Sequence, residues 1–316
     1  MNTKFNEVVI VAAVRTPIGT YKGSLKNIKA DQLGSIVIKE IINRANINCE
    51  DIDEVILGQV LTAGTGQNPA RQASINAGLP KSTPAHLVNQ VCGSGLRSVI
   101  SGFQTIKLNE AKYIISGGQE NMSKAPHVLF YRNENKLSKE NLIDTMIYDG
   151  LIDAFNNYHM GITAENIAEK FKISREEQDN FALKSQGKTQ LSLEKNKFKD
   201  ELVAVNLGSS FLDRDEYPRK NLKVEDLEKL KTVFKENGTV TPGNASGIND
   251  GAAAVLLTSS NEAEKRSLKP LVRIASWSSV GVEPSLMGLG PINAVRLALK
   301  KANWKIHDVD LFEINE

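Results

Sequence analysis

The sequence is short of cysteine, of one-sided charge and of long apolar runs, and each shortage excludes a class of protein. Its 316 residues include only two cysteines, Cys49 and Cys92, which argues against a disulfide scaffold and a cysteine-rich zinc module. The formal net charge is +2, so no chain-wide basic field calls for nucleic acid or an anionic membrane as a partner. The first apolar run spans only about seven residues, too few for a secretory signal or a membrane span. We therefore expect a cytoplasmic protein.

What is present in the first 120 residues is an alternation of strand-like runs and helical periodicity, which is typical of a parallel sheet with crossover helices. The predicted strands cover residues 7–12, 55–57, 85–91 and 113–115. One predicted helix begins after Asn68, where Asn-Pro supplies a cap and a first-turn proline, and ends near Gly78. The apolar faces of the other two helices are predicted to contain Leu33, Ile36, Val37 and Ile41, and Leu96, Val99, Ile100, Phe103 and Ile106. This pattern predicts an α/β fold.

The middle of the chain has a different character. Residues 120–244 are more polar and helical, with a capping-box spacing at Ser174 and Glu177. Strand-like runs return at 252–257 and 271–276. We therefore predict a first unit made of residues 1–119 and 245–269, an inserted subdomain at 120–244, and the start of a second unit at 270–316.

A weak internal repeat links the two ends of the chain. Residues 45–58 (ANINCEDIDEVILG) align without gaps with residues 302–315 (ANWKIHDVDLFEIN), with the same order of helix end, Asp-x-Asp and buried strand. Four identities in fourteen positions can also arise by chance. If the repeat is genuine, the fold contains two similar β/α units, and the second is incomplete in the sequence given.

Cys92 is the candidate nucleophile. An apolar strand runs into Cys-Gly-Ser-Gly and then directly into a helix, which places the thiol at a helix N-terminus, where thiolate is favoured. A lone cysteine is more often a small buried hydrophobe, but glycine and serine neighbours fit that role poorly. Cys49, in a polar turn, is expected to be structural. None of the four histidines is identifiable as the base that Cys92 needs.

Seven segments resemble the thiolase family, and more closely its short-chain biosynthetic branch. They are VAAVRTPIG at 11–19, GQNPARQ at 66–72, NQVCGSGLRS at 89–98, GGQENMS at 117–123, HMGITAEN at 159–166, TVTPGNASGINDGAA at 239–253 and INE at the end of the sequence. The related ketoacyl synthases share the fold and the elbow cysteine, but HMGITAEN and NASGINDG favour thiolase. The resemblance implies a layered αβαβα fold.

The implied reaction is reversible condensation of two acetyl-CoA molecules to acetoacetyl-CoA and CoA, through an acyl group on Cys92. Coenzyme A is then a substrate and product, and no cofactor or metal is expected. Asn315 matches the family asparagine that positions a water in an oxyanion hole. Ser246 matches the serine that contacts pantetheine, and Arg219 matches an arginine near the adenine nucleotide. The remaining positions expected to line the CoA pocket are Leu151, His159, Met160, Phe234 and Met287. Core packing or solvated charge is an open alternative for each.

The sequence departs from the family pattern in one respect. Thiolases carry a Gly-His-Pro segment and a Cys-x-Gly segment after the Asn-Glu motif, and neither occurs in these 316 residues. The chain as given is therefore expected to turn over little by itself, and the alternative is a non-catalytic, truncated thiolase-like protein that binds CoA or a partner. The resemblance also implies a homo-oligomer, either a dimer or a tetramer.

Overall fold

The computed structural model describes residues 7–130 and 141–315, and these fall into two compact units. Unit 1 contains the described residues within Met1–Gly150, Phe198–Tyr217 and Ile248–Ile274. Unit 2 contains those within Leu151–Lys197, Pro218–Gly247 and Ala275–Glu316. The middle of the chain thus contributes to both units, and the domain boundaries expected from the sequence stay a prediction.

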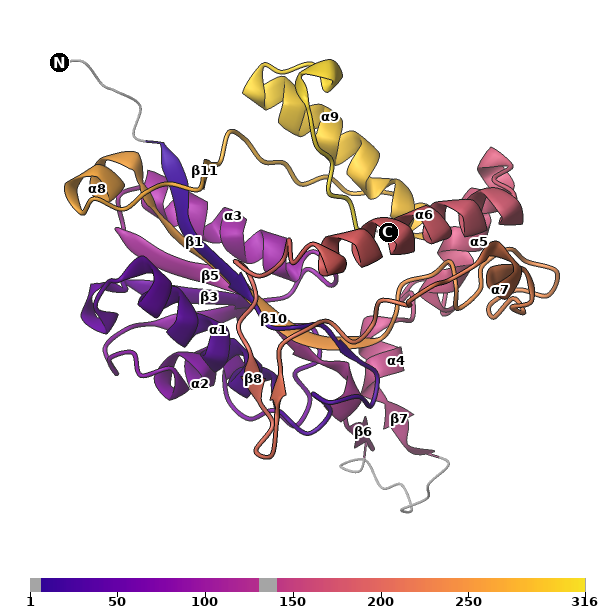
Figure 1. The fold of residues 1–316 in the computed structure, drawn as a ribbon, viewed down its shortest axis with the longest axis horizontal. Helices are drawn as coiled ribbons and strands as arrows, with labels where there is room; N and C mark the ends of the chain where they lie inside the picture. The colour runs from indigo at the N-terminus through magenta and orange to yellow at the C-terminus, as the bar shows by residue number, and fades with distance from the viewer. Residues whose placement is uncertain (1–6, 131–140, 316) are drawn as a thin grey trace. The chain divides into compact units, whose positions relative to one another are not determined.

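Unit 1 is built on a mixed seven-stranded sheet (Figure 1). Its strands are β1 (Val8–Arg15), β2 (Gly19–Thr20), β3 (Glu54–Gly58), β4 (Ala85–Val88), β5 (Tyr113–Asn121), β10 (Asn249–Ser259) and β11 (Val272–Arg273). Their order is β11-β1-β10-β5-β3-β4, with β2 paired to β10. β3 pairs in parallel with β4 and β5, whereas β10 is antiparallel to both β5 and β1. β1, β3, β4 and β5 therefore run in one direction, as predicted, and β10 lies among them in the opposite direction.

Alternate side chains of the sheet enter two separate cores. Val55 and Leu57 of β3 pack with α1 (Ala30–Ala45) and α2 (Pro69–Asn76), whereas Ile56 packs in a smaller core with α3 (Ser94–Lys107). Because successive strand residues point to opposite faces, α1 and α2 cover one face of the sheet and α3 lies on the other. Unit 1 is therefore a three-layer α/β arrangement.

The local helix signals in the sequence are confirmed. Asn68 caps α2, accepting a hydrogen bond from the backbone N–H of Arg71 at 3.1 Å. The chain leaves this helix through Gly78, whose φ of +95° is readily available only to glycine. Ser174 and Glu177 form the predicted capping box of α6 (Arg175–Glu194).

Between two stretches of unit 2, the segment Phe198–Tyr217 belongs to unit 1. It contains a small hairpin of β8 (Val205–Asn206) and β9 (Phe211–Leu212). Arg15, at the end of β1, fastens it by donating to both carboxylate oxygens of Asp215, at 2.7 and 3.0 Å, and to Glu201 at 2.6 Å. These bidentate, charge-assisted contacts specify geometry as well as adding stability. The segment Phe198–Tyr217 is thereby held at the carboxyl end of β1.

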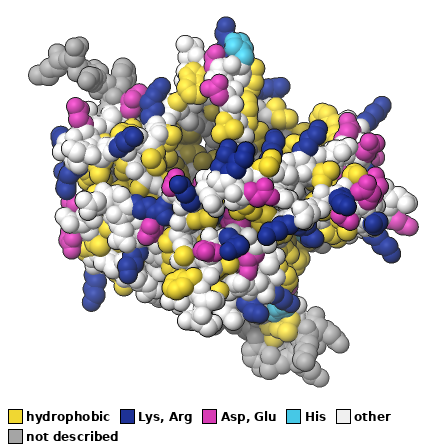
Figure 2. Space-filling view, viewed as in Figure 1, with side chains coloured by type: hydrophobic (Ala, Val, Ile, Leu, Met, Phe, Trp, Pro, Cys, Tyr) yellow, Lys and Arg dark blue, Asp and Glu magenta, His cyan; other side chains and the backbone are white. Residues whose placement is uncertain are grey.

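The remaining elements are shorter in unit 1 and mainly helical in unit 2. Unit 1 adds η1 (Cys49–Asp51), η2 (Met122–Lys124), the β6 (His127–Val128) and β7 (Ile143–Asp144) pair, α4 (Thr145–Gly150) and α8 (Ser260–Lys265). Unit 2 contains α5 (Met160–Phe171), α6, α7 (Val224–Glu228), η4 (Pro284–Leu289), α9 (Gly290–Ala302) and η5 (Ile306–Asp308). Within the described ranges, no helix has the length and apolar composition needed to cross a membrane. Figure 2 shows basic and acidic side chains interspersed over the visible face, in line with the small net charge.

Three expectations about unit 1 are wrong in detail. The strand predicted at 85–91 ends at Val88, because the chain turns sharply before Cys92. The strand predicted at 271–276 is only Val272–Arg273, which pairs with Val9 and Ile10 of β1. Leu96, placed on the apolar face of α3, is 71% exposed and borders an open groove of about 380 Å³. Its helical phase is correct for burial, but no described side chain covers it.

The internal repeat is visible in backbone geometry. α1 ends at Ala45 and α9 at Ala302, and each is followed by an asparagine with left-handed φ, +50° at Asn46 and +57° at Asn303. A one-turn 3₁₀ helix follows at the same spacing in each copy, η1 and η5. The match ends there: β3 lies buried between β4 and β5, whereas residues 309–315 pair with no strand among the described residues, and Leu311 is 83% exposed. The buried strand predicted for the second copy is therefore wrong.

The repeat yields a stability prediction. Asn46→Ala and Asn303→Ala should each lower the free energy of unfolding by roughly 1 kcal/mol, because alanine is strained at positive φ. Asn→Gly at the same sites should be neutral or stabilising. Urea denaturation followed by circular dichroism measures both, and equal effects of alanine and glycine at either position would contradict the shared cap.

Candidate active site

Cys92 lies in a tight elbow between β4 and α3. Ser94, the first residue of α3, closes the elbow: its Oγ accepts from the backbone N–H of Gln90 at 2.8 Å and donates to the carbonyl of Val91 at 2.5 Å. The N–H of Gly93 donates to the carbonyl of Gln90 at 3.0 Å. These bonds hold the thiol two residues before the first turn of the helix.

The backbone immediately before the thiol is strained. Val91 has a φ of +48°, which is unusual for a β-branched residue and costs of order 1–3 kcal/mol. Its N–H is satisfied by Oδ1 of Asn89 at 2.9 Å. Cys92 is exposed, whereas Cys49 is only partly exposed and packs against the larger core. The two cysteines thus differ in exposure, and the roles expected for them stay predictions.

Three glycines allow the elbow to lie directly on the sheet. Gly58 of β3 is paired with Gly118 of β5, and both face the start of α3. A Cβ at Gly58 would lie 2.4 Å from the carbonyl carbon of Ser94 and 2.5 Å from the nitrogen of Gly95. One at Gly118 would lie 3.4 Å from the Cα of Gly95. We call Gly58, Gly95 and Gly118 the glycine junction; at Gly58 no side chain fits without moving backbone.

Cys92 borders an open cleft of about 340 Å³ within unit 1. The ends of β3 and β5 and the start of β10 line it, and they contribute four polar side chains, Gln119, Glu120, Asn249 and Asp250. No histidine occurs among the described residues lining the cleft. Within the described ranges, no three His, Cys, Asp or Glu side chains are grouped so that they could hold a metal ion.

The carboxylates of this cleft were missed by the sequence reasoning. Glu120 accepts from the backbone N–H groups of Val60 at 2.7 Å and Leu61 at 3.3 Å, yet burial raises its pKa from 4.5 to about 7, with a smaller contribution from the charge of Asp250. Asp250 is 1% exposed, and its Oδ2, like Oε1 of Gln119, has no hydrogen-bond partner among the described residues. The cleft thus holds acceptors beside Cys92. In the sequence, the only sign of Gln119, Glu120 and Asp250 is that they lie within the thiolase-like segments at 117–123 and 239–253.

In unit 2 the structure brings four of the predicted CoA-pocket residues together. The N–H of Met160 donates to the carbonyl of Leu151 at 2.8 Å, and the rings of His159 and Phe234 stack with centroids 4.5 Å apart. His159 caps α5, with its Nδ1 accepting from the N–H of Gly161 at 3.0 Å. Burial lowers the pKa of His159, which favours the neutral ring that this acceptor role requires.

The other predicted residues lie on separate segments of unit 2. Met287 is exposed on η4, which is tied to α5 by a bond from Asn166 Nδ2 to the carbonyl of Ser285 at 3.0 Å. Arg219 is exposed, and its backbone N–H donates to Gln186 at 2.9 Å. Ser246 and Asn315 are also exposed. Exposure leaves these side chains accessible to a ligand, but the roles assigned to them stay predictions.

Substitution within the glycine junction should create a steric clash between β3 and α3. Gly58→Ala should destabilise unit 1 by roughly 1–3 kcal/mol, because the new methyl group meets backbone that cannot rotate away. Chemical denaturation measures the loss. Gly187→Ala is the matched control, since a Cβ at this helical glycine meets nothing within 4 Å. An unchanged stability in Gly58→Ala would contradict the close approach of β3 and α3.

Glu120 predicts a dependence of stability on pH. A carboxyl group whose pKa is raised on folding binds its proton more tightly in the folded state than in the unfolded state. Its contribution to the free energy of unfolding therefore falls as pH rises from about 4.5 through about 7. The shift corresponds to roughly 3 kcal/mol at most. The stability of Glu120→Gln relative to the parent protein should therefore be greater at pH 8 than at pH 4.5. Urea titrations of both proteins at both pH values measure this difference. An equal stability difference at both pH values would show that Glu120 is not perturbed.

Comparisons with known proteins agree with this geometry. Residues 8–261 match the model of the thiolase N-terminal domain, and residues 268–316 match that of the thiolase C-terminal domain. The chain is 51% identical over 314 residues to acetyl-CoA acetyltransferase of Paracoccus denitrificans, covering 98% of this chain and 80% of the relative. It is 49% identical over 322 residues to the cytosolic acetyl-CoA acetyltransferase of Mus musculus, covering 100% of this chain and 81% of the relative.

A solved structure shows the same fold. The crystal structure of the Bacillus anthracis acetyl-CoA acetyltransferase superposes with a TM-score of 0.93 at 37% identity, covering 97% of this chain and 79% of that one. This confirms the predicted fold class, a thiolase-like layered α/β fold. With both domain models matched and about half of all positions identical to these relatives, the chain belongs to the thiolase family.

Proposed function

We propose that this protein is an acetyl-CoA C-acetyltransferase that uses Cys92 to carry the acetyl group. The observation that carries the proposal is the exposed thiol of Cys92, held in a strained elbow at the start of a helix in a member of the thiolase family. A structural cysteine would gain nothing from that strain. The names of the relatives supply the substrate class, acetyl-CoA.

The proposed chemistry has two half-reactions. In the first, Cys92 gives its proton to a base, its sulfur attacks the thioester carbonyl of acetyl-CoA, and CoA leaves as a thiolate that takes up a proton. In the second, a base takes a proton from the α-carbon of another acetyl-CoA, and the resulting enolate attacks the acetyl group on Cys92. Acetoacetyl-CoA forms, and the Cys92 thiolate leaves and takes up a proton. The proposal assigns stabilisation of the oxyanion that develops on the carbonyl to the backbone N–H of Cys92.

The proposal assigns CoA binding to unit 2. Ser246 contacts the pantetheine amide, Arg219 lies near the adenine nucleotide, and Asn315 positions a water for the second oxyanion. The stacked pair of His159 and Phe234 supports a wall of the pantetheine channel. That wall is completed by Leu151, Met160 and Met287. In support of this assignment, α5, η4 and the segment carrying Phe234 pack within one unit.

Three further expectations accompany this function. Association into a dimer or tetramer, a cytoplasmic location and low turnover by these 316 residues alone stay predictions. The proposed chemistry requires a base for Cys92 and an acid/base for the α-carbon of the second acetyl-CoA. Thiolysis of acetoacetyl-CoA, followed spectrophotometrically, measures the turnover directly.

Acetyl transfer to Cys92 is tested by intact-mass spectrometry after incubation with acetyl-CoA. The parent protein and Cys49→Ala should gain one acetyl group, and Cys92→Ala should gain none, with peptide mapping to identify the modified residue. Acetylation that persists in Cys92→Ala would overturn the assignment. Binding of CoA without any acetylation would instead favour the non-catalytic alternative.

A further inference from the structure

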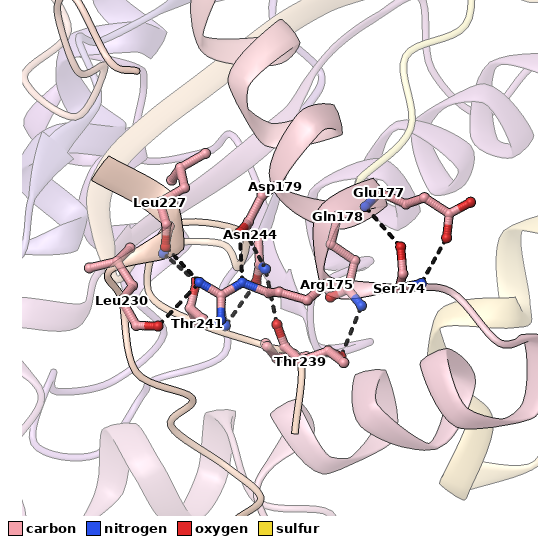
Figure 3. A network of polar contacts seen from close by, with 12 residues as sticks. Ser174, Arg175, Glu177, Gln178, Asp179, Leu227, Leu230, Thr239, Thr241 and Asn244 are labelled. Atoms are coloured by element: carbon pink, nitrogen blue, oxygen red, sulfur yellow. Dashed lines mark hydrogen bonds and ion pairs between the residues drawn. The ribbon is translucent and has the colours of Figure 1, made fainter. Parts of the chain in front are cut away.

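Unit 2 contains a charged pair on α6 that none of the proposed chemistry uses (Figure 3). Arg175 and Asp179 lie one helical turn apart, and Nε of Arg175 donates to Oδ2 of Asp179 at 2.6 Å. The Asp179 side chain is only 3% exposed. A carboxylate this deeply buried is costly unless it is fully hydrogen-bonded, so the destinations of its remaining bonds are informative.

Asp179 holds the loop that leads to Ser246. Its Oδ1 accepts from Nδ2 of Asn244 at 2.9 Å, and the same amide group donates to the carbonyl of Thr239 at 3.1 Å. Oδ1 of Asn244 accepts from the N–H of Thr241 at 2.8 Å. Asn244 therefore closes residues 239–244 into a compact turn, here called the 239–244 loop, and Asp179 anchors that turn to α6.

Arg175 holds the neighbouring segment at the same point. Its Nη2 donates to the carbonyls of Leu227 at 2.6 Å and Leu230 at 3.1 Å, at the end of α7. The loop packs on the same two leucines, since a Cβ at Gly243 would lie 2.5 Å from Leu227 and 2.6 Å from Leu230. α7 follows Arg219 in the chain and precedes Phe234. One ion pair thus ties together two segments that carry proposed CoA contacts.

A second buried carboxylate holds the beginning of the loop. Glu165 of α5 is 3% exposed and accepts from the N–H groups of Thr239, at 2.8 and 2.9 Å, and Val240, at 2.7 Å. Gln178 of α6 donates to Oγ1 of Thr239 at 2.9 Å. α5 begins at Met160, next to the stacked pair of His159 and Phe234. The loop is therefore fixed at both ends by groups from two helices.

We propose that Asp179 is a positioning residue for acyl-CoA binding, which acts through Asn244 to fix the 239–244 loop and with it Ser246. This inference rests on the proposed function, in which Ser246 contacts pantetheine. A general physical reason supports it: a packed apolar pair would stabilise α6 as well as an ion pair does, whereas directional hydrogen bonds select one loop conformation. A ligand that must contact Ser246 then pays no ordering cost for the loop.

The test measures the dissociation constant for CoA by isothermal titration calorimetry, at a temperature well below the unfolding midpoint. Asp179→Asn and Asn244→Ala should each weaken CoA binding by about tenfold or more, the size expected for loss of a charge-assisted hydrogen bond. The double variant should be little worse than either single variant, because both break the same link. Glu177→Gln is the matched control, since Glu177 is two residues away on α6 but serves only the helix cap. Its CoA affinity should be unchanged.

A rescue variant separates positioning from a merely structural role. Arg175→Gln combined with Asp179→Asn removes both charges, so neither is left buried without a partner. Compared with Asp179→Asn alone, the variant that carries both Arg175→Gln and Asp179→Asn should regain thermal stability but should still bind CoA weakly. Recovery of CoA affinity together with stability would overturn the inference. Unchanged affinity in Asn244→Ala, which keeps the ion pair intact, would overturn it as well.

The outcomes also separate this inference from the proposed function. If the parent protein binds CoA and the Asp179→Asn and Asn244→Ala variants bind it equally well, the inference fails and the proposed function stands. If the parent binds CoA and the variants do not, while Cys92 is never acetylated by acetyl-CoA, the inference stands and the acyl-transfer chemistry fails. A parent protein that binds no CoA at all contradicts both.

Discussion

The contact on which the elbow of Cys92 depends is the approach of the first turn of α3 to the backbone of the sheet. Gly58, Gly95 and Gly118 meet there, and a Cβ at Gly58 would lie within 2.5 Å of the helix backbone. Because the helix starts directly on β3 and β5, the link from β4 has little length in which to turn. The turn is therefore sharp, Val91 adopts a positive φ, and the thiol of Cys92 is left exposed. The strain is a consequence of the packing, and the packing is possible because glycine occupies the contact.

Much of this was predictable because its causes are local. The cap of α2 at Asn68 and the capping box at Ser174 depend on residues within a few positions of each other, and both are confirmed. The alternation of strands and helices in the first 120 residues correctly indicated strands running in one direction. The candidate nucleophile was identifiable for the same reason, since the strand, the glycines and the helix are contiguous around Cys92.

The features that escaped the sequence reasoning depend on residues far apart in the chain. The place of β10 between β1 and β5 joins segments more than a hundred residues apart, and no local pattern encodes it. Buried carboxylates were missed for a related reason: in the sequence Asp179 and Glu165 are indistinguishable from solvated charges on amphipathic helices. Only the fold shows that Asn244 and the backbone of Thr239 satisfy them. Leu96 shows the converse, an apolar residue in the right helical phase that remains exposed.

Two features carry the proposed function, the exposed thiol of Cys92 in unit 1 and the 239–244 loop of unit 2, which we propose orders a contact with CoA. The claim that the fold makes Cys92 the reactive cysteine is tested most directly by a short pulse of iodoacetamide, with quantitative peptide mapping of both cysteines. In the native protein Cys92 should be alkylated about tenfold faster than Cys49 or more, and the two rates should converge in denaturant. Equal rates for the two cysteines in the native protein would contradict the account.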